Sequence, residues 1–228
     1  MNASQKPSIT WSYSSLDLFK QCPKKYYHLR VKKDVVDPPT EAKDYGTDVH
    51  LVAEEFVRDK KPIPKKYDYM SKALEVLSNF EGTHLCEQKL GLTEDLEPCD
   101  FGAENVWWRG IVDLLIIQDD KAYMVDYKTG KNAKYAKKDQ LEIFSLAVFK
   151  HYPQIKKVKA GLLYVVANEF IKQDYLQENA DIYWQRWIRD ANRLEESVIH
   201  NVWNAKPNFT CRGWCPVVNC THWEPNRK

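Results

Sequence analysis

The stretch from Trp107 to Gly130, WWRGIVDLLIIQDDKAYMVDYKTG, constrains the fold more than any other part of this sequence. Two apolar runs flank a short polar turn, and each run carries one aspartate, Asp113 or Asp126. Apolar runs joined by a tight polar turn predict two antiparallel β-strands. Side chains two residues apart on a strand share a face, so Asp126 and Lys128 are expected to point the same way. The hairpin therefore brings two carboxylates and an ammonium to one edge of a buried sheet.

Two carboxylates held together in an apolar setting favour a bound cation. Their like charges repel where water is excluded, and a metal ion between them relieves the repulsion. Carboxylate oxygens suit Mg²⁺ and Mn²⁺, and water bound to such an ion attacks phosphorus more readily. We therefore interpret Asp113 and Asp126 as metal ligands and catalytic residues, with the Lys128 ammonium beside an attacked phosphate. The alternative is a pair of aspartates that only solvate the ends of the hairpin.

Further motifs stand in order around the hairpin and span well over half of the chain. They are Ser12-Tyr13-Ser14-Ser15-Leu16, Cys22-Pro23-Lys24-Lys25-Tyr26-Tyr27, Gly46-Thr47-Asp48-Val49-His50, Trp108-Arg109-Gly110-Ile111-Val112-Asp113, Asp126-Tyr127-Lys128-Thr129-Gly130 and Gln140-Leu141-Glu142-Ile143-Phe144. In this order and spacing the set resembles the PD-(D/E)XK nuclease superfamily, and within it the RecB-like and phage-type exonuclease branch. Phe144 stands where the family motif has a tyrosine.

The resemblance implies roles for four more residues. It makes His50 a metal ligand and lets the peptide carbonyl of Tyr127 add another ligand. Glu87, on the strand before the hairpin, would help to hold the metal or orient the water. Gln140 would form hydrogen bonds near the active site or to the DNA backbone. For each side chain a bland alternative stays open, since a lone histidine is usually structural, and a glutamate or glutamine is usually at the surface.

Hydrophobic periodicity predicts an α/β fold in which helices flank a central mixed β-sheet, as in the restriction-endonuclease-like core that the resemblance implies. Helices are expected over 16–31, 42–58, 67–80, 140–151 and 180–203, and strands beside the hairpin over 83–92 and 158–166. The length of 228 residues fits a single nuclease domain, 1–228. We expect a motif-bearing core, 12–144, and a cysteine-rich tail, 206–228, that packs on the N-terminal helix.

Four of the six cysteines form a second pattern. Cys211, Cys215 and Cys220 crowd into the tail, and Cys22 precedes the nuclease motifs. This set resembles the iron–sulfur nucleases of the superfamily, which include the CRISPR-associated adaptation nucleases and the AddB type, and it implies a [4Fe–4S] cluster. Zn²⁺ bound by the same thiols, with His222, is an alternative, as are free buried cysteines. Cys86 and Cys99 are expected to be structural.

The net charge of +2 excludes a globally basic nucleic-acid binder, so the distribution of charge says more. Four lysines follow the hairpin and are candidates for DNA binding: Lys131, Lys134, Lys137 and Lys138. A solvated face is the alternative. Aromatic residues near the tail, Trp203, Phe209, Trp214 and Trp223, either stack on unpaired bases or pack the tail onto the core.

No apolar run approaches the roughly 18 residues that cross a bilayer, and the N-terminus lacks the apolar segment of a secretory signal. We therefore expect a cytoplasmic protein, in the host cytoplasm if its source is viral, with no membrane partner. The resemblance implies a DNA exonuclease of recombination, repair or replication that uses Mg²⁺ or Mn²⁺, alone or with a single-strand annealing or recombination protein. The alternatives are a structure-specific or CRISPR-adaptation-type endonuclease and a catalytically inert DNA-binding module. An inert module should have lost part of its site, whereas Asp113, Asp126 and Lys128 are all present.

Overall fold

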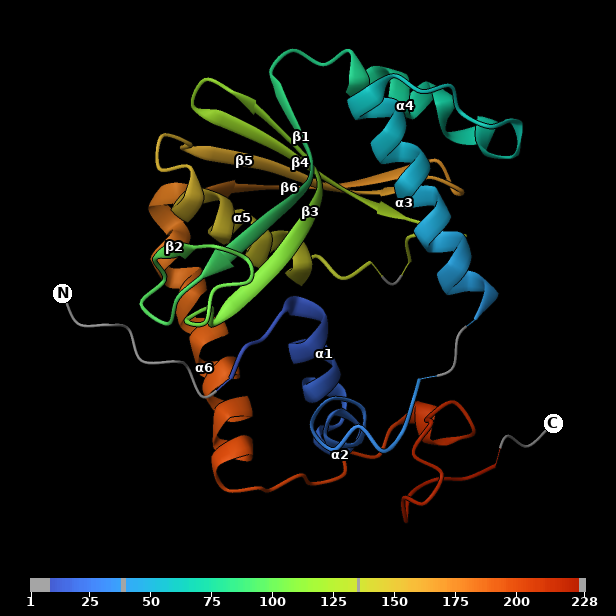
Figure 1. Ribbon diagram of the computed structural model, residues 1–228, viewed down its shortest axis with the longest axis vertical. Helices are drawn as coiled ribbons and strands as arrows, with labels where there is room; N and C mark the ends of the chain where they lie inside the picture. Colours follow the sequence, from blue (N-terminus) through green and yellow to red (C-terminus); the bar gives the residue numbers. More distant parts are fainter. Residues whose placement is uncertain (1–8, 38–39, 135, 226–228) are drawn as a thin grey trace.

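A six-stranded mixed β-sheet forms the centre of the molecule (Figure 1). The computed structural model describes residues 9–37, 40–134 and 136–225. The strand order is β2 (Pro98–Cys99), β1 (Thr83–Leu92), β3 (Trp108–Gln118), β4 (Lys121–Lys128), β5 (Lys157–Tyr164) and β6 (Glu169–Leu176). Only β4 and β5 pair in parallel; every other neighbouring pair is antiparallel. The prediction of an α/β fold with a central mixed sheet is confirmed.

The predicted hairpin is formed by β3 and β4. Its two-residue turn places Asp119 at φ 51°, the left-handed conformation that matches the twist of the two strands. The ladder runs from the Gln118–Lys121 pair to the Leu114–Val125 pair. A parallel neighbour then requires a long crossover, and helix α5 (Asp139–His151) supplies it between β4 and β5.

The N-terminal helix expected over 16–31 is broken, and that prediction is wrong in detail. Helix α1 (Tyr13–Gln21) ends at Cys22, α2 (Pro23–Tyr26) follows at once, and the chain continues as a π-helical turn (Tyr27–Val31). Cys22 is extended, at φ −163° and ψ 107°, because the ring of the following Pro23 disfavours the helical conformation there. Cys22 therefore stands at the junction between α1 and α2.

The remaining helices lie close to their predicted positions. They are α3 (Glu41–Asp59), α4 (Ser71–Ser78), α5 and α6 (Ala180–Ile199). The helix expected over 67–80 begins instead as a 3₁₀ turn (Lys65–Met70), since Pro62 and Pro64 precede it and limit its first turn. Two strands were not expected. Strand β2 has only two residues, and β6 is a largely exposed edge strand without the apolar run that would mark it.

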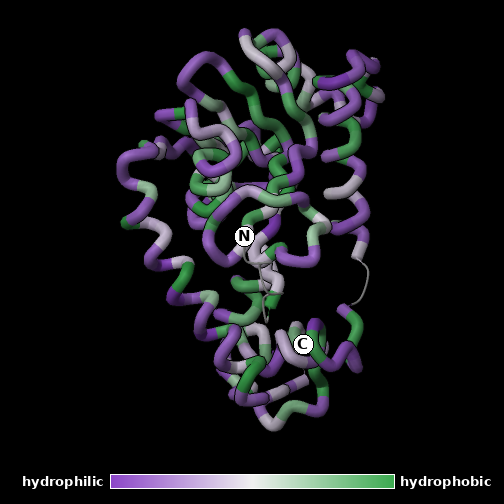
Figure 2. Tube along the Cα trace, turned by 60° about the vertical axis from the view of Figure 1, so that its left-hand side comes forward, coloured by the Kyte–Doolittle hydropathy of each residue, from purple (hydrophilic) through white to green (hydrophobic). Residues whose placement is uncertain are grey.

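Two apolar clusters hold the helices to opposite faces of the sheet. One packs α5, α6 and α1 against one face and includes Leu115, Leu141 and Trp187. The other packs α3 and α4 against the opposite face through Val49, Leu74 and neighbouring side chains. Figure 2 shows the hydrophobic segments gathered along the strands, with hydrophilic segments along the outer helices. Among the described residues, no helix combines the length and apolar character needed to cross a membrane.

The tail lies against the N-terminal helices rather than against the sheet (Figure 1). The backbone N–H of Lys206 contacts Cys22 Sγ at 3.5 Å, and the ring of Trp203 stacks on Tyr26 with centroids 6.0 Å apart. An ion pair of 2.7 Å between Lys20 and the buried Asp190 joins α1 to α6. Residues 10–34 and 203–225 are called the tail lobe below.

Gly110 on β3 should tolerate no side chain. A Cβ there would lie 2.5 Å from the ring of Phe144, which is itself buried against Trp108 and cannot move aside. Gly110→Ala is expected to lower the free energy of unfolding by about 1–3 kcal/mol, the usual cost of overpacking a core. Urea unfolding measures this. Phe144→Leu combined with Gly110→Ala should recover part of the loss, and a fully stable single variant would contradict the packing described here.

Candidate active site

Strands β3 and β4 separate at the two predicted aspartates. The ladder ends at the Leu114–Val125 pair, and beyond it the Asp113 carboxylate, not a backbone carbonyl, accepts the Tyr127 N–H at 2.8 Å. On its other side, β3 pairs with β1 at Leu114 and Val112, and the ladder is interrupted between them, where Asp113 stands opposite Glu87. Asp113 and Asp126 are each only 9% exposed. A fork in the sheet thus holds two buried carboxylates side by side.

The first group at this fork is His50, Glu87 and Asp113. Their candidate ligand atoms all lie within 4.8 Å of one another, although the residues come from α3, β1 and β3. His50 Nδ1 lies 3.4 Å from an oxygen of Asp113. Glu87 has a φ of 49°, which is rare for a residue other than glycine and interrupts the regular alternation of the strand. The Glu87 carboxylate is therefore directed toward the fork by a strained backbone conformation.

The orientation of His50 follows from its second nitrogen. Nε2 donates a hydrogen bond of 3.0 Å to the peptide carbonyl of Tyr127, which can only accept. With the proton on Nε2, neutral His50 presents the Nδ1 lone pair to the two carboxylates. A carbonyl that fixes the tautomer in this way supports a ligating histidine. The Tyr127 carbonyl, predicted as a ligand, is engaged by His50 here.

The second group is Asp126, Lys128 and Gln140. Lys128 Nζ donates to Gln140 Oε1 at 2.9 Å and lies 2.6 Å from Asp126 Oδ2, while Gln140 Nε2 donates to Asp126 Oδ1. The amide of Gln140 thus holds both charged side chains at once. Asp126 Oδ2 is fully buried, and the Lys128 ammonium is the positive charge that faces it.

The carboxylates concentrated at the fork shift the pKa values of its titratable groups. Burial and the neighbouring Asp113 raise the pKa of Asp126 to about 6, although Lys128 acts against the shift. Burial and Asp113 also raise the pKa of Glu87. For His50, burial opposes the charged form, but the hydrogen bond and charge of Asp113 outweigh it and leave the pKa raised. All three shifts favour the protonation state with the more positive charge, so a positive charge at the fork is stabilised there. Carboxylates with one imidazole nitrogen fit Mg²⁺ or Mn²⁺.

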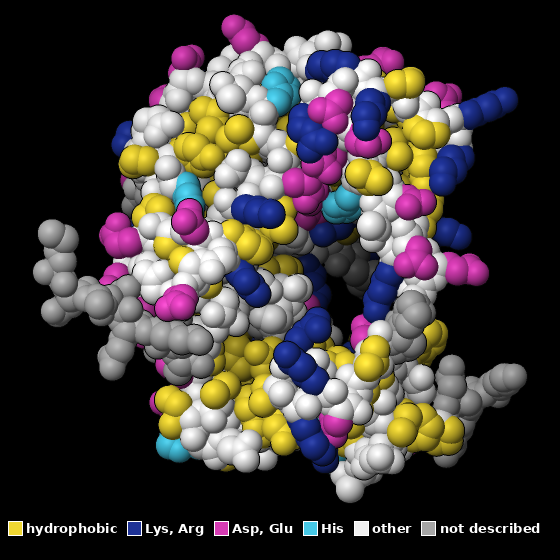
Figure 3. Space-filling model, in the orientation of Figure 1, with side chains coloured by type: hydrophobic (Ala, Val, Ile, Leu, Met, Phe, Trp, Pro, Cys, Tyr) yellow, Lys and Arg dark blue, Asp and Glu magenta, His cyan; other side chains and the backbone are white. Residues whose placement is uncertain are grey.

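The lysines that follow the hairpin lie on the loop between β4 and α5. Lys131, Lys134, Lys137 and Lys138 are all exposed. Lys137 forms an ion pair of 2.8 Å with Asp17 of α1, so this loop is tied to the tail lobe. Figure 3 shows a hollow between the sheet and the tail lobe, with Lys and Arg side chains around it and acidic side chains at its upper border.

The four tail-pattern cysteines come together. Cys22, Cys211, Cys215 and Cys220 line one small cavity together with His222. Within the described part of the chain, no three of these thiols lie within 4.8 Å of one another, in contrast to the group around His50. Cys86 and Cys99 lie outside this cavity, on β1 and β2.

Sequence reasoning missed Glu54. It lies one helical turn after His50 on α3 and borders the same cavity as His50 and Glu87. Its spacing of four residues from a predicted ligand was an available signal, since such pairs share a helix face. Its ion pair with Arg58 holds it at the edge of the site.

Comparisons with known proteins identify the family of this chain. The profile of the PD-(D/E)XK nuclease superfamily matches residues 10–85 and 69–220. The crystal structure of SSO0001 aligns with 98% of this chain and 91% of its own, at 13% identity and a TM-score of 0.46. A structure titled "Putative exonuclease" from Eubacterium rectale aligns with 100% of this chain and 91% of its own, at 10% identity and a TM-score of 0.53. The latter shares the fold. No curated protein matches this chain.

Asp126→Asn should stabilise the metal-free protein. Above a pH of about 6 the wild-type carboxylate is charged in the folded state, and its raised pKa means that this charge costs stability. The amide removes the charge, so the melting temperature in EDTA at pH 8 should rise by a few degrees, and the gain should fade toward about pH 4, where Asp is protonated even when unfolded. Differential scanning calorimetry checks both.

The same variant should lose most of the rise in melting temperature that Mn²⁺ gives the wild type. Asp120→Asn, which removes an exposed carboxylate from the turn of the same hairpin, is the matched control and should change neither value. A metal-free Asp126→Asn protein that melts below the wild type would show that the carboxylate is stabilising.

Proposed function

The chain belongs to the PD-(D/E)XK nuclease superfamily, and we propose that it is a metal-dependent DNA exonuclease of recombination, repair or replication. The observation that carries this proposal is the fork, where His50, Glu87 and Asp113 converge beside the Asp126 carboxylate and the Lys128 ammonium. Each residue type that phosphodiester hydrolysis requires is present within this one buried site, on rigid strands and helices.

Divalent metal fits the donors at the fork. His50, Asp113 and Asp126 would hold Mg²⁺ or Mn²⁺, with Glu87 as a further carboxylate and the Tyr127 carbonyl as a further oxygen. Use of the carbonyl would require His50 to release it. A metal in this position supplies a water molecule of lowered pKa and a counter-charge for the phosphate.

Side chains of the protein itself would neutralise charge on the phosphate and accept a proton from water. Lys128 is held by Gln140 and Asp126, so its ammonium is fixed before substrate arrives and can neutralise charge that develops on a phosphate oxygen. Glu87 has a raised pKa, which suits a carboxylate that accepts a proton from water. Burial of the fork excludes bulk water and strengthens each of these interactions.

An exonuclease is favoured over an endonuclease by two observations. The similar fold from Eubacterium rectale carries an exonuclease title. The active site borders a hollow lined by Lys and Arg, which suits a DNA end more than an open face would (Figure 3). A structure-specific or CRISPR-adaptation-type endonuclease is the second candidate. The intact Asp113, Asp126 and Lys128 argue against an inert DNA-binding module. A single-strand annealing or recombination protein is a suitable partner for an enzyme of this kind.

Lys128→Ala should abolish metal-dependent DNA cleavage, with a loss of at least about 10²-fold in rate, because it removes a preorganised charge at the phosphate. Asp126→Ala should do the same through loss of a metal ligand. Digestion of end-labelled linear DNA with Mn²⁺ or Mg²⁺ measures the rate. Lys121→Ala, which removes an exposed lysine from the other end of β4, is the matched control and should cut at the wild-type rate.

Linear and covalently closed circular DNA of the same sequence separate the two modes of cleavage. An exonuclease degrades only the linear form and releases mononucleotides or short products. Cleavage of closed circles would favour the endonuclease, and undiminished cleavage by Lys128→Ala would sink the proposed site.

We also propose that the four clustered cysteines bind a [4Fe–4S] cluster. In a tetrahedral zinc site the Zn–S bond of about 2.3 Å brings sulfur atoms to within about 4 Å of one another. Cys22, Cys211, Cys215 and Cys220 line one cavity, and among the described residues no three of their sulfur atoms lie within 4.8 Å of one another, which suits a larger inorganic core. Such a cluster would join α2 to the tail, and its loss would loosen the tail lobe.

Anaerobic purification should give a brown protein with about four iron atoms per chain. Cys215→Ser should remove most of the iron and the visible absorption, whereas Cys99→Ser, a change outside the cavity, should keep both. Elemental analysis measures iron and zinc together. A colourless protein that holds zinc in place of iron would reject the cluster.

A further inference from the structure

Two large aromatic side chains stand out from the tail lobe. Phe209 is 80% exposed and Trp214 is 70% exposed. Their neighbours Trp203 and Trp223 behave differently: Trp203 packs on Phe19, Tyr26 and Tyr27, and the Trp223 indole N–H donates to the Cys215 carbonyl at 3.1 Å. Packing of the tail therefore uses two of its aromatics and leaves the other two in water. Both exposed rings fall within residues 209–214, and exposed apolar groups gathered on one short segment are candidates for an interaction site.

The exposure of Phe209 and Trp214 is built into an ordered loop. The Asn208 side chain accepts hydrogen bonds from the Thr210 N–H at 2.9 Å and from the Thr210 hydroxyl at 2.7 Å. The Trp214 N–H donates to the Thr210 carbonyl at 3.1 Å, which closes the loop between the two rings. The backbone thus holds both rings outward, so little ordering is required when a ligand stacks on them.

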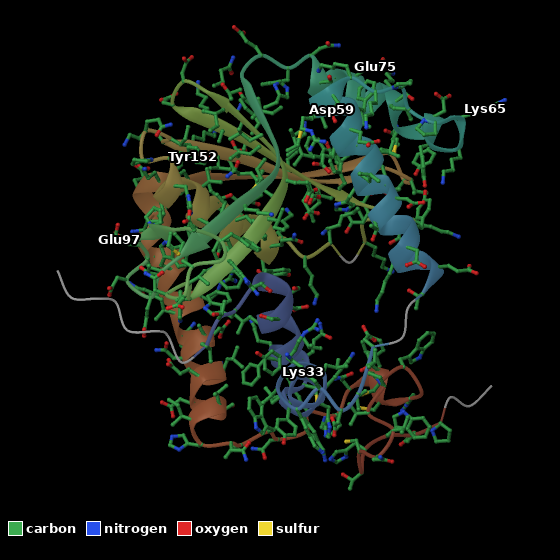
Figure 4. All side chains as sticks on the ribbon, viewed as in Figure 1. Lys33, Asp59, Lys65, Glu75, Glu97 and Tyr152 are labelled. Carbon is green, nitrogen blue, oxygen red and sulfur yellow. The ribbon has the colours of Figure 1, made fainter. Side chains whose placement is uncertain are left out.

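Charge is segregated onto the same lobe. The tail lobe carries eight Lys and Arg against three Asp and Glu, an excess of five positive charges in a chain whose net charge is +2. The basic residues are Lys20, Lys24, Lys25, Arg30, Lys32, Lys33, Lys206 and Arg212. Lys33, labelled in Figure 4, lies across the hollow from the sheet. The remainder of the chain is therefore slightly acidic. A lobe of this charge attracts a polyanion.

We propose that Phe209 and Trp214 stack on unpaired bases of a single-stranded stretch of DNA, with the lysines and arginines of the tail lobe on its phosphates. This inference rests on the proposed function for the identity of the polymer. Exposed aromatic rings beside basic side chains are the combination that binds single strands, because every base offers a flat face once it leaves the duplex. A duplex hides those faces.

The position of the tail lobe fits this occupant. It borders the hollow that also adjoins the fork, and the loop with Lys131 and Lys137 reaches from the fork to α1 (Figures 1 and 3). A strand whose end lies at Asp126 would follow this loop toward the tail lobe. The enzyme would then hold several unpaired nucleotides during cleavage, so DNA with a single-stranded end would be a better substrate than a blunt duplex.

Binding without cleavage tests the inference directly. Wild-type protein in EDTA is titrated into a fluorescein-labelled oligo-dT of about 20 nucleotides and into a blunt duplex of equal length, with anisotropy as the readout. The double variant Phe209→Ala/Trp214→Ala should weaken oligo-dT binding by about tenfold or more and duplex binding by less than about twofold. Its salt dependence should be unchanged, whereas Arg212→Gln should lower the salt slope by about one.

Three controls guard against loss of structure. Phe209→Tyr/Trp214→Phe keeps two stacking rings and should bind oligo-dT like the wild type. Phe170→Ala removes another exposed phenylalanine, on β6 and outside the tail lobe, and should leave binding unchanged. The melting temperatures of the alanine double variant and of the wild type should agree, since neither ring is buried.

Each contrary outcome is distinct. Equal weakening of oligo-dT and duplex binding would overturn stacking on unpaired bases. Unchanged DNA binding together with lost self-association in sedimentation experiments would assign the rings to a protein contact and would also overturn it. A double variant that binds and digests oligo-dT like the wild type overturns this inference and leaves the nuclease intact. Conversely, a wild type that binds oligo-dT through the rings but cuts nothing with Mn²⁺ sinks only the proposed function.

Discussion

The hydrogen bond from the Tyr127 N–H to the Asp113 carboxylate is the interaction on which the site depends. It replaces a rung of the β3–β4 ladder with a side chain, so the strands part at this point. β3 continues beside β1 while β4 continues beside β5, and the fork between them accepts α3 from one face and α5 from the other. His50 and Gln140 reach the carboxylates only because the sheet opens there.

The fork trades stability for function. Asp113 and Asp126 are buried, like-charged neighbours, and the raised pKa of Asp126 shows that Lys128 offsets only part of the cost. Glu87 adds backbone strain at a position where glycine would be unstrained. Burial of the two apolar clusters on the faces of the sheet offsets the destabilisation from the buried charges and from the backbone strain. A site optimised only for the stability of the metal-free protein would lack one of these charges. It would then also lack the affinity for a divalent ion.

The sequence predicted what short-range patterns determine. Alternation and a polar turn were sufficient for the β3–β4 hairpin, and ordered motifs for the grouping of His50 with the aspartates, since strand geometry fixes which side chains share a face. The sequence did not predict features that depend on which tertiary contacts form. The left-handed backbone of Glu87, the engagement of the Tyr127 carbonyl by His50 and the exposed edge strand β6 follow from packing that no local pattern records. The helix break at Cys22 could have been predicted from the sequence, because the following Pro23 disfavours a helical conformation at Cys22.

The net charge of the chain does not reveal how its charges are distributed, and this distribution matters most for an enzyme that acts on nucleic acid. A value near neutrality results from an acidic fork and a basic tail lobe in one chain, which attract a divalent cation and a polyanion to different places. The separation is useful because lysines placed within the fork would compete with the metal for its carboxylates. Lys128 is the exception: its ammonium pairs with Asp126 at 2.6 Å, and Gln140 holds both groups in place. The aromatic residues and lysines proposed to act on the polymer, together with the clustered cysteines, thus lie on the tail lobe, away from the metal ligands. Substitutions there can change DNA affinity without disturbing the chemistry at the fork.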